Sequence, residues 1–185
     1  MAMQFAVSTR NARLDAIETD AGTSAKMMLY TGAMPGNCAA ATTGSKLVEF
    51  DLASDWAANA SGGAKSFNNA PITASAVASG MAGYFRVYKS DGTTCQMQGL
   101  CAQAWGGSVA WALNQQCVNN GLVYKVTTAG ISAASGGPTG TGSGITDNTV
   151  TWAYVGTVDM TLDNDSIANT QVVNVTSFSL TDGNA

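Results

Sequence analysis

The feature that most constrains the fold is a β-hairpin pattern in the middle of the chain. Tyr84–Lys89 and Thr94–Gln98 each alternate between apolar and polar side chains, and the turn residues Ser90-Asp91-Gly92-Thr93 separate them. Asp-Gly between two alternating runs favours a tight antiparallel hairpin, because glycine readily adopts the positive φ that such turns need. We expect Phe85 and Val87 to face one side of the hairpin, with Cys95 and Met97 as their cross-strand partners.

Five further segments have the signature of strands. The clearest, Lys46–Leu52, places three apolar side chains on one face and two acidic ones on the other, which indicates a half-buried strand. In the last segment the apolar phase changes near Thr176-Ser177, which predicts a β-bulge. The predicted strands are Lys26–Thr31, Lys46–Leu52, Ile72–Val77, Val158–Leu162 and Gln171–Leu180.

A short helix is expected ahead of these strands, over residues 8–21. Leu14, Ile17 and Ala21 recur at helical spacing and share one face, and Gly22 is suited to end the helix. We expect this face to pack against a sheet or a neighbouring subunit. The chain is therefore expected to be mainly β, an antiparallel β-sandwich with a short N-terminal helix.

Residues 100–156 differ in composition from the segments on either side. They contain three of the four tryptophans and a run rich in Gly, Ser and Thr from residue 135 to 144. Strands predicted at Leu122–Thr128 and Thr149–Val155 would form a small sheet that depends on aromatic packing. We expect a small β-rich domain inserted into a host domain, which is formed by residues 1–99 plus 157–185.

The composition argues against catalysis. Only 11% of residues are charged, against roughly 25% in an average soluble domain, and Ser, Thr, Asn and Gly supply most of the polarity. The chain has no histidine, which removes the commonest general base and the commonest metal ligand. These features favour a rigid binding protein covered by neighbouring subunits, without a catalytic site or a cofactor.

The distribution of charge argues against nucleic-acid binding. The formal net charge is −4 and no Lys or Arg follows Lys125, whereas affinity for phosphates depends on Lys and Arg. The opening Met-Ala-Met-Gln does not resemble a secretory signal, and no stretch approaches the ~20 apolar residues that span a bilayer. We therefore expect a protein made in a cytoplasm, without membrane insertion.

Segments on both sides of the expected insert resemble a family of small phage and prophage proteins encoded among virion structural genes. In shorter members the Cys-x-Met-Gln-Gly strand runs almost directly to the Asp-Met-Thr-Leu-Asp strand, which also implies that residues 100–156 are an insert. The family supplies no catalytic or binding residue. It implies a place in a tailed bacteriophage virion, assembled in the bacterial host cytoplasm. The resemblance rests on Asn11–Glu18, Ala39–Ala41 after Asn37-Cys38, Ser54–Trp56, Gly92–Gly99 and Thr176–Ala185.

The insert itself is similar to a module found in phage tail and fibre proteins. Asn120–Gly130, Gly137–Gly142 and Ile145–Trp152 carry this similarity. The module looks like the short chitin- or carbohydrate-binding type of β-module, which implies a host surface glycan as a candidate partner. We expect most of the insert's aromatic residues in its own small core, with Trp105 and Trp111 as the exposed pair that can stack on sugar rings.

The four cysteines leave the disulfide state open. Cys38 and Cys95 lie in the expected host domain, whereas Cys101 and Cys117 lie in the expected insert. If bridges form, the economical pairing is 38–95 and 101–117, which is one of three pairings. Free buried thiols are the alternative, because phages assemble in a reducing cytoplasm. The irregular spacing, without a CxxC motif, argues against zinc.

One group of acidic residues, Asp159, Asp163 and Asp165, could offer oxygens to calcium. The spacing lacks the regular pattern of a calcium loop, and Asp163-Asn164-Asp165 is typical of a solvated turn. We favour the turn, and we expect neither a metal site nor a catalytic pair of carboxylates.

These observations predict a non-enzymatic structural protein of the virion, exposed as an accessory component of the tail, fibre or head–tail region. A capsid decoration protein that cements subunits is one alternative. A carbohydrate-binding adhesin that contacts the host surface is another, from a different class. The expected partners are tail, fibre or capsid subunits and, since closed symmetric assembly is the rule, further copies of the same chain.

Overall fold

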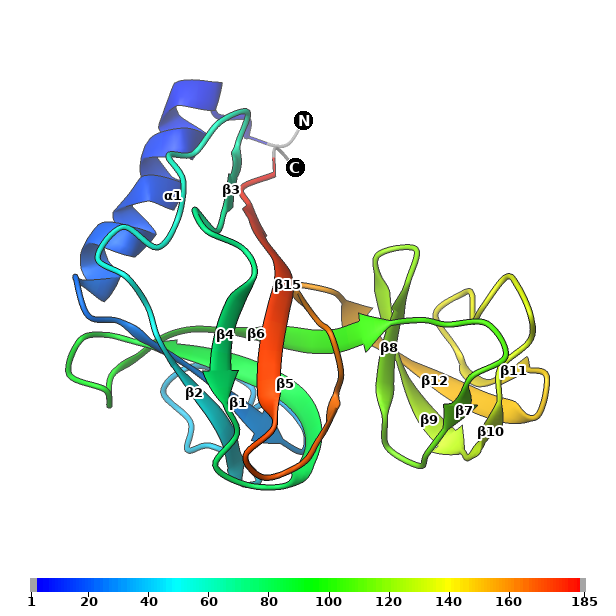
Figure 1. The fold of residues 1–185 in the computed structure, drawn as a ribbon. Helices are drawn as coiled ribbons and strands as arrows, with labels where there is room; N and C mark the ends of the chain where they lie inside the picture. The colour runs from blue at the N-terminus through cyan, green and yellow to red at the C-terminus, as the bar shows by residue number, and fades with distance from the viewer. Residues whose placement is uncertain (1–2, 184–185) are drawn as a thin grey trace.

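Two bodies of β-structure, a larger and a smaller lobe, are built by residues 3–183, which the computed structural model describes (Figure 1). The chain is mainly β with one short N-terminal helix, as the sequence predicts. The larger lobe contains α1 (Val7–Ala21), β1 (Lys26–Thr31), β2 (Lys46–Asp51), β3 (Ala64–Ser66), β4 (Ile72–Ser75), β5 (Gly80–Tyr88), β6 (Cys95–Ala104), β13 (Met160–Leu162), β14 (Ser166–Ile167) and β15 (Val172–Thr181). The smaller lobe contains β7 (Ala110–Trp111), β8 (Gln116–Asn119), β9 (Leu122–Thr128), β10 (Gly130–Ile131), β11 (Ser143–Asp147) and β12 (Val150–Thr157).

The larger lobe is a β-sandwich whose two sheets are joined at both edges. One sheet has the order β2–β1–β5–β6 and the other has the order β6–β13–β15–β4, so β6 belongs to both. At the opposite edge, a bridge between Val48 and Ala76 connects β2 to the end of β4, and the N–H of Val77 donates to the carbonyl of Leu47. Joining the edges pairs backbone groups that an open sheet would leave to solvent.

Two strand pairings correct the expectation of a purely antiparallel sandwich. β13 runs parallel to β6, with Met160 opposite Cys101, and β8 runs parallel to β6 with Cys117 opposite Gln103. Parallel neighbours need a crossover of roughly a dozen or more residues between them. The smaller lobe is that crossover, since the chain leaves the larger lobe through β6 and returns to it in β13.

The β5–β6 hairpin forms where the alternating segments predict it. Val87 lies opposite Met97 as expected, but Cys95 lies opposite Tyr88, because the register shifts between Val87 and Tyr88. Gly92 in the turn has a φ of 69°. The carboxylate of Asp91 accepts hydrogen bonds from the hydroxyl and the backbone N–H of Thr94. These bonds favour the ionised carboxylate and lower the pKa of Asp91 to about 2. The turn is therefore fixed by its own side chains.

Aromatic residues from both sheets meet in the core of the larger lobe. Phe178 stacks on Phe67, with ring centroids 4.5 Å apart, and meets the rings of Trp56 and Phe85 at steep angles. Trp56 and Phe67 lie on the long segment between β2 and β4, so their burial attaches this segment to the sandwich. Around these rings lie aliphatic side chains such as those of Leu29, Leu47, Val48, Val87, Leu162, Val173 and Val175.

The bulge predicted in the last strand is confirmed. Thr161 lies opposite Ser177, but Leu162, the next residue, lies opposite Val175. Thr176 is therefore the extra residue on β15. The bulge keeps Val175 on the buried face of the sheet after the apolar phase has changed.

Helix α1 is attached largely by polar contacts rather than by an apolar face alone. Leu14 and Ala21 are buried, and two ion pairs with the helix are made by Lys65 of β3, whose side chain is only 1% exposed. Its ammonium lies 3.0 Å from Asp15 and 2.9 Å from Glu18. Burial by itself lowers the pKa of Lys65, and the bonds to Glu18 and Asp15 outweigh that effect and raise it.

The smaller lobe has its own sheet and its own core. Its strands lie in the antiparallel order β11–β12–β9–β8, and β7 and β10 form a short separate ribbon. Trp111 and Trp152 pack edge to face with ring centroids 5.1 Å apart. The buried cluster consists of Trp111, Cys117, Tyr124, Val126, Val150 and Trp152.

Candidate functional site

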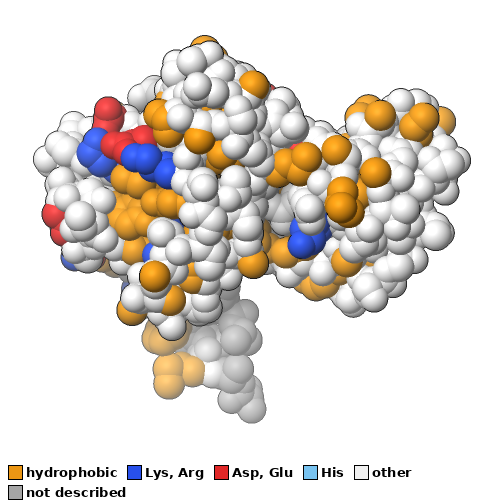
Figure 2. Space-filling view, turned by 90° about the horizontal axis from the view of Figure 1, so that it is seen from below, with side chains coloured by type: hydrophobic (Ala, Val, Ile, Leu, Met, Phe, Trp, Pro, Cys, Tyr) orange, Lys and Arg blue, Asp and Glu red, His pale blue; other side chains and the backbone are white. Residues whose placement is uncertain are grey.

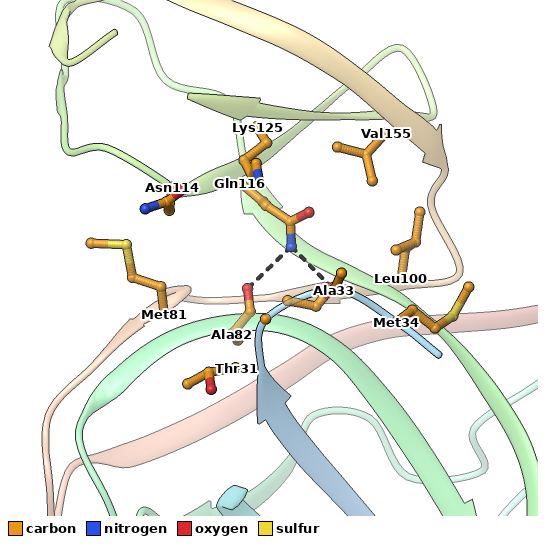
Figure 3. A pocket seen from close by; sticks show the side chains of 12 residues that line it. Thr31, Ala33, Met34, Met81, Ala82, Leu100, Asn114, Gln116, Lys125 and Val155 are labelled. Atoms are coloured by element: carbon orange, nitrogen blue, oxygen red, sulfur yellow. Dashed lines mark hydrogen bonds between the residues drawn. The ribbon is translucent and has the colours of Figure 1, made fainter. Parts of the chain in front are cut away.

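A cleft of about 640 Å³ lies where the two lobes meet (Figure 3). The larger lobe contributes the segment that follows β1 and parts of β5 and β6. The smaller lobe contributes residues of β8, β9 and β12, and Asn114, which lies just ahead of β8. The lining residues are Thr31, Gly32, Ala33, Met34, Met81, Ala82, Gly83, Leu100, Asn114, Gln116, Lys125 and Val155.

Small residues shape the larger lobe's side of this cleft. β1 ends at Thr31, and the chain turns at Gly32 with a φ of 85°. A Cβ atom added at Gly83 would lie 2.0 Å from the carbonyl oxygen of Gly32. Glycine at position 83 therefore allows β5 and the end of β1 to approach this closely.

Gln116 provides a fixed hydrogen-bond acceptor in the cleft. Its side chain is 4% exposed, and its amide nitrogen donates to the carbonyl oxygens of Ala82 at 3.1 Å and Gly83 at 3.0 Å. Figure 3 shows the amide oxygen pointing away from these carbonyls, into the cleft. Within residues 3–183, no donor bonds to this oxygen.

Lys125 is the cross-strand partner of Gln116. The register of β8 and β9 places the two residues opposite one another, so their side chains project from the same face of the sheet. Lys125 and Asp147 are the charged residues of segment 105–157, and Asp147 is buried. Figure 2 shows the resulting basic spot on the smaller lobe, near the junction and among apolar side chains. In the described part of the chain Lys125 forms no ion pair.

Asp165, from the larger lobe, ties the two lobes together beside the cleft. It is fully buried, and its carboxylate accepts hydrogen bonds from the side chain of Gln115 at 3.1 Å and from the backbone N–H of Gln116. Its own N–H donates to the side chain of Gln103. Burial raises the pKa of Asp165 to about 6, although the hydrogen bonds to the carboxylate oppose this rise.

Sequence reasoning missed Gln116 and Lys125 as a pair. The signal that could have found them is Asn120-Gly121, whose φ values of 51° and 76° form a two-residue turn between β8 and β9. Counting outward from that turn pairs Gln116 with Lys125. Nothing in the sequence, however, indicates that Ala82 lies across from them.

The expected pair of exposed tryptophans is wrong for Trp111. Trp111 is 2% exposed, because it packs against Trp152 in a lobe that has few other large apolar side chains. Trp105 is partly exposed, and its ring N–H donates to Asp147 at 2.9 Å. Of the two residues, only Trp105 offers part of its surface to a glycan.

All four cysteines are free thiols in the structure. Cys38 and Cys95 come from distant segments of the chain. Burial, and then the nearby Cys38 thiol, raise the pKa of Cys95 to about 12. Cys101 and Cys117 are fully buried, and burial raises the pKa of both thiols. Cys101 packs in the core of the larger lobe, not in the expected insert.

The three acidic residues considered for calcium point to different partners. Asp159 accepts a hydrogen bond from the N–H of Leu100, and Asp163 accepts one from the N–H of Asn174. Asp165 is buried rather than part of a solvated turn, which corrects that expectation. No cluster of three potential metal-ligating His, Cys, Asp or Glu residues occurs among the residues described.

Comparisons with protein-family models, with curated proteins and with solved structures returned no match to this chain. Among the described residues, no helix combines the length and the apolar character needed to cross a membrane.

Proposed function

We propose that this chain is a non-enzymatic structural protein of a tailed bacteriophage virion, an accessory component of the tail, fibre or head–tail region exposed on the particle. Two resemblances support the proposal. The segments outside residues 100–156 resemble virion structural proteins, and residues 100–156 are similar to a module of tail and fibre proteins. Its localisation would then be the virion.

The observation that supports the proposal best is the continuity of β6. Its first part pairs with β5 inside the larger lobe, and its last part pairs with β13 on one side and β8 on the other. The smaller lobe is therefore connected to the larger lobe through a hydrogen-bonded strand rather than a flexible linker (Figure 1). This geometry suits a protein that presents one lobe at a fixed orientation while the other lobe is anchored.

Exposed apolar side chains on the larger lobe are the candidate anchors. Val77 and Val172 are 58% and 56% exposed and lie at the adjoining ends of β4 and β15, while Met3 and Val7 are exposed in the N-terminal segment. Apolar side chains at such positions can pack against tail, fibre or capsid subunits, or against further copies of this chain.

The test is the copy number of the protein in purified particles, measured by quantitative mass spectrometry against the major capsid protein. A few tens of copies or fewer per particle is the expected result for a tail, fibre or connector component. Hundreds of copies would replace this assignment with capsid decoration. Absence of the protein from purified particles would refute a virion function.

A carbohydrate-binding adhesin is the second candidate function, and the partly exposed ring of Trp105 favours it. Binding of the protein to host surface glycans would support this function if Trp105→Ala abolishes the binding. Trp105→Phe would abolish it as well only if the larger indole ring is needed. Equal glycan binding by the Trp105→Ala protein and the unaltered protein would exclude this residue as the contact.

A further inference from the structure

We propose that the cleft between the lobes binds the C-terminal residue of a peptide, or an N-acylated amino acid of the same chemistry, with an aliphatic side chain. The shared chemistry is a carboxylate, an adjacent amide N–H and a short apolar group. The cleft's volume of about 640 Å³ lies within the roughly 300–1,000 Å³ of small-molecule sites. The inference concerns the isolated protein, so it stands or falls independently of a place in a virion.

The apolar group is indicated by the walls of the cleft. Met34 from the larger lobe and Val155 from the smaller lobe are both large apolar residues that remain more than a third exposed. Leu100 lies between them, and Met81 lies on the other side of Gln116 (Figure 3). An aliphatic group between these side chains would remove apolar surface from water on both lobes, and methionine adapts readily to the shape of a ligand.

The carboxylate is indicated by Lys125. Its ammonium is the exposed charge of the smaller lobe and has no carboxylate partner within residues 3–183. Most other cationic side chains in the described chain are already paired, such as Lys26 with Glu49 and Lys65 with Glu18. An anion in the cleft would give Lys125 a charge-assisted hydrogen bond.

The amide N–H is indicated by Gln116. Three backbone carbonyls accept from its amide nitrogen, which fixes the orientation of the side chain and leaves the amide oxygen able to accept a hydrogen bond. Asp165 holds the backbone of the same residue, so the acceptor is positioned before any ligand arrives. In an N-acylated amino acid the amide nitrogen is attached to the carbon that bears the carboxylate. The amide N–H would bond to Gln116 and the carboxylate to Lys125, because these two residues are neighbours across β8 and β9.

A neutral sugar fits the cleft less well than an aliphatic ligand. Apart from Thr31, Lys125 and two glycines, the residues that line the cleft carry aliphatic, thioether or amide side chains, and none of the lining residues within 3–183 is aromatic. Sugar rings are usually bound against flat aromatic faces, whereas branched aliphatic side chains pack well against methionine, leucine and valine.

The experiment is a titration of the full-length, isotope-labelled protein, followed by amide NMR signals, with N-acetyl-leucine and with N-acetyl-leucinamide. We expect saturable shifts at Gly32, Gly83, Gln116 and Lys125, and roughly tenfold weaker binding of the uncharged amide. Equal binding of the two compounds, or saturation without shifts at these residues, would overturn the proposal. The spectra also report whether each variant is folded.

Two lysine variants separate the site from general charge. Lys125→Met should weaken N-acetyl-leucine binding by about tenfold and abolish the difference between acid and amide. The matched control Lys46→Met removes an exposed lysine from β2, outside the cleft, and should leave both affinities unchanged. An equal loss in both variants would contradict a local contact with Lys125.

Two further ligands show whether the natural ligand is a protein C-terminus or a free acylated amino acid, and whether the cleft prefers an aliphatic group to a sugar ring. Tighter binding of a short acetylated peptide ending in leucine than of N-acetyl-leucine would assign the site to a protein C-terminus, and the reverse order would assign it to a free acylated amino acid. Glucuronate carries the same charge on a sugar ring. Glucuronate binding as tight as that of N-acetyl-leucine would overturn the aliphatic specificity.

Discussion

The two lobes reach a folded core by different means. The larger lobe packs aliphatic side chains and phenylalanines from two sheets that are joined at both edges. The smaller lobe has Trp111, Trp152 and Tyr124 with three smaller side chains. It adds one buried carboxylate, Asp147, which accepts hydrogen bonds from Trp105, Trp152 and the backbone N–H of Ala133.

The difference follows from size. A segment of fewer than about sixty residues buries too small a fraction of its surface for an aliphatic core to be sufficient. Aromatic rings, which each bury on the order of 150–250 Å², supply more apolar area per residue. Their N–H groups then need acceptors, and Asp147 provides one for two rings. The smaller lobe should therefore depend on a few residues, and the larger lobe on many.

Removing one ring from the smaller core tests this dependence most severely. Trp152→Ala should lower the free energy of unfolding by roughly 3–5 kcal/mol. Amide hydrogen exchange should accelerate first in β9 and β12, while β1 and β5 remain protected. The matched control Phe85→Ala, in the larger core, should accelerate exchange in both lobes. Uniform acceleration in the Trp152→Ala protein would show that the lobes do not differ in this way.

The boundary between the lobes should be sensitive to pH through Asp165. Its pKa is raised from 3.8 to about 6, so between these values the folded protein keeps a proton that the unfolded chain has lost. Stability from this group therefore falls as pH rises from about 4 to about 6, and is constant above that. Two pH units correspond to about 3 kcal/mol as an order of magnitude.

Comparison with Asp165→Asn isolates this effect, because every other titrating group is present in both proteins. The stability of the unaltered protein relative to the variant should decrease between pH 4 and pH 7, as measured by urea unfolding. A difference that does not depend on pH would mean that Asp165 titrates near its ordinary value.

The buried acceptor of the smaller lobe should matter more than an exposed one in the larger lobe. Asp147→Ala leaves the N–H groups of Trp105 and Trp152 without their acceptor, and should lower the free energy of unfolding by about 2 kcal/mol. Asp163→Ala removes an exposed carboxylate that bonds to Asn174, and should have an effect below about 1 kcal/mol. Equal effects in thermal or urea unfolding would argue against the special role of Asp147.

The smallest expected change is covalent and confined to one pair of thiols. Glutathione disulfide should link Cys38 to Cys95, because the Cys38 thiol is near enough to raise the pKa of Cys95, and should leave the other two cysteines reduced. Cys117 lies opposite Gln103, so its Cα is about 8 Å from that of Cys101 by strand spacing and rise, beyond the ~7 Å limit for a disulfide. Peptide mapping by mass spectrometry identifies the bridge, and a 101–117 link would contradict this register.

Much of the local structure could be predicted from the sequence. The strands at Lys26–Thr31 and Leu122–Thr128 have the predicted limits, and helix α1 begins one residue earlier than expected and ends as predicted. The bulge at Thr176 also follows from the sequence, because a change in the apolar phase of a strand must be absorbed by an extra residue. Periodicity and turn residues are properties of chain neighbours, and neighbours are what a sequence shows directly.

In the candidate site, too, one part could be predicted from neighbours in the sequence and the other part could not. The turn at Asn120-Gly121 determines that Gln116 faces Lys125, so this half of the cleft is encoded within ten residues. That Gln116 meets the carbonyl of Ala82, and that Asp165 is buried against its N–H, depends on how the two lobes pack.

What the sequence by itself determined is therefore the mainly β class, the hairpins and the single helix. Only the tertiary structure decided the parallel pairing of β13 with β6, the burial of Trp111 and the existence of a cleft between the lobes. The physical reason is that register and burial between distant segments depend on the packing of whole sheets. The free energy of that packing is summed over many contacts, and no short stretch of sequence contains it.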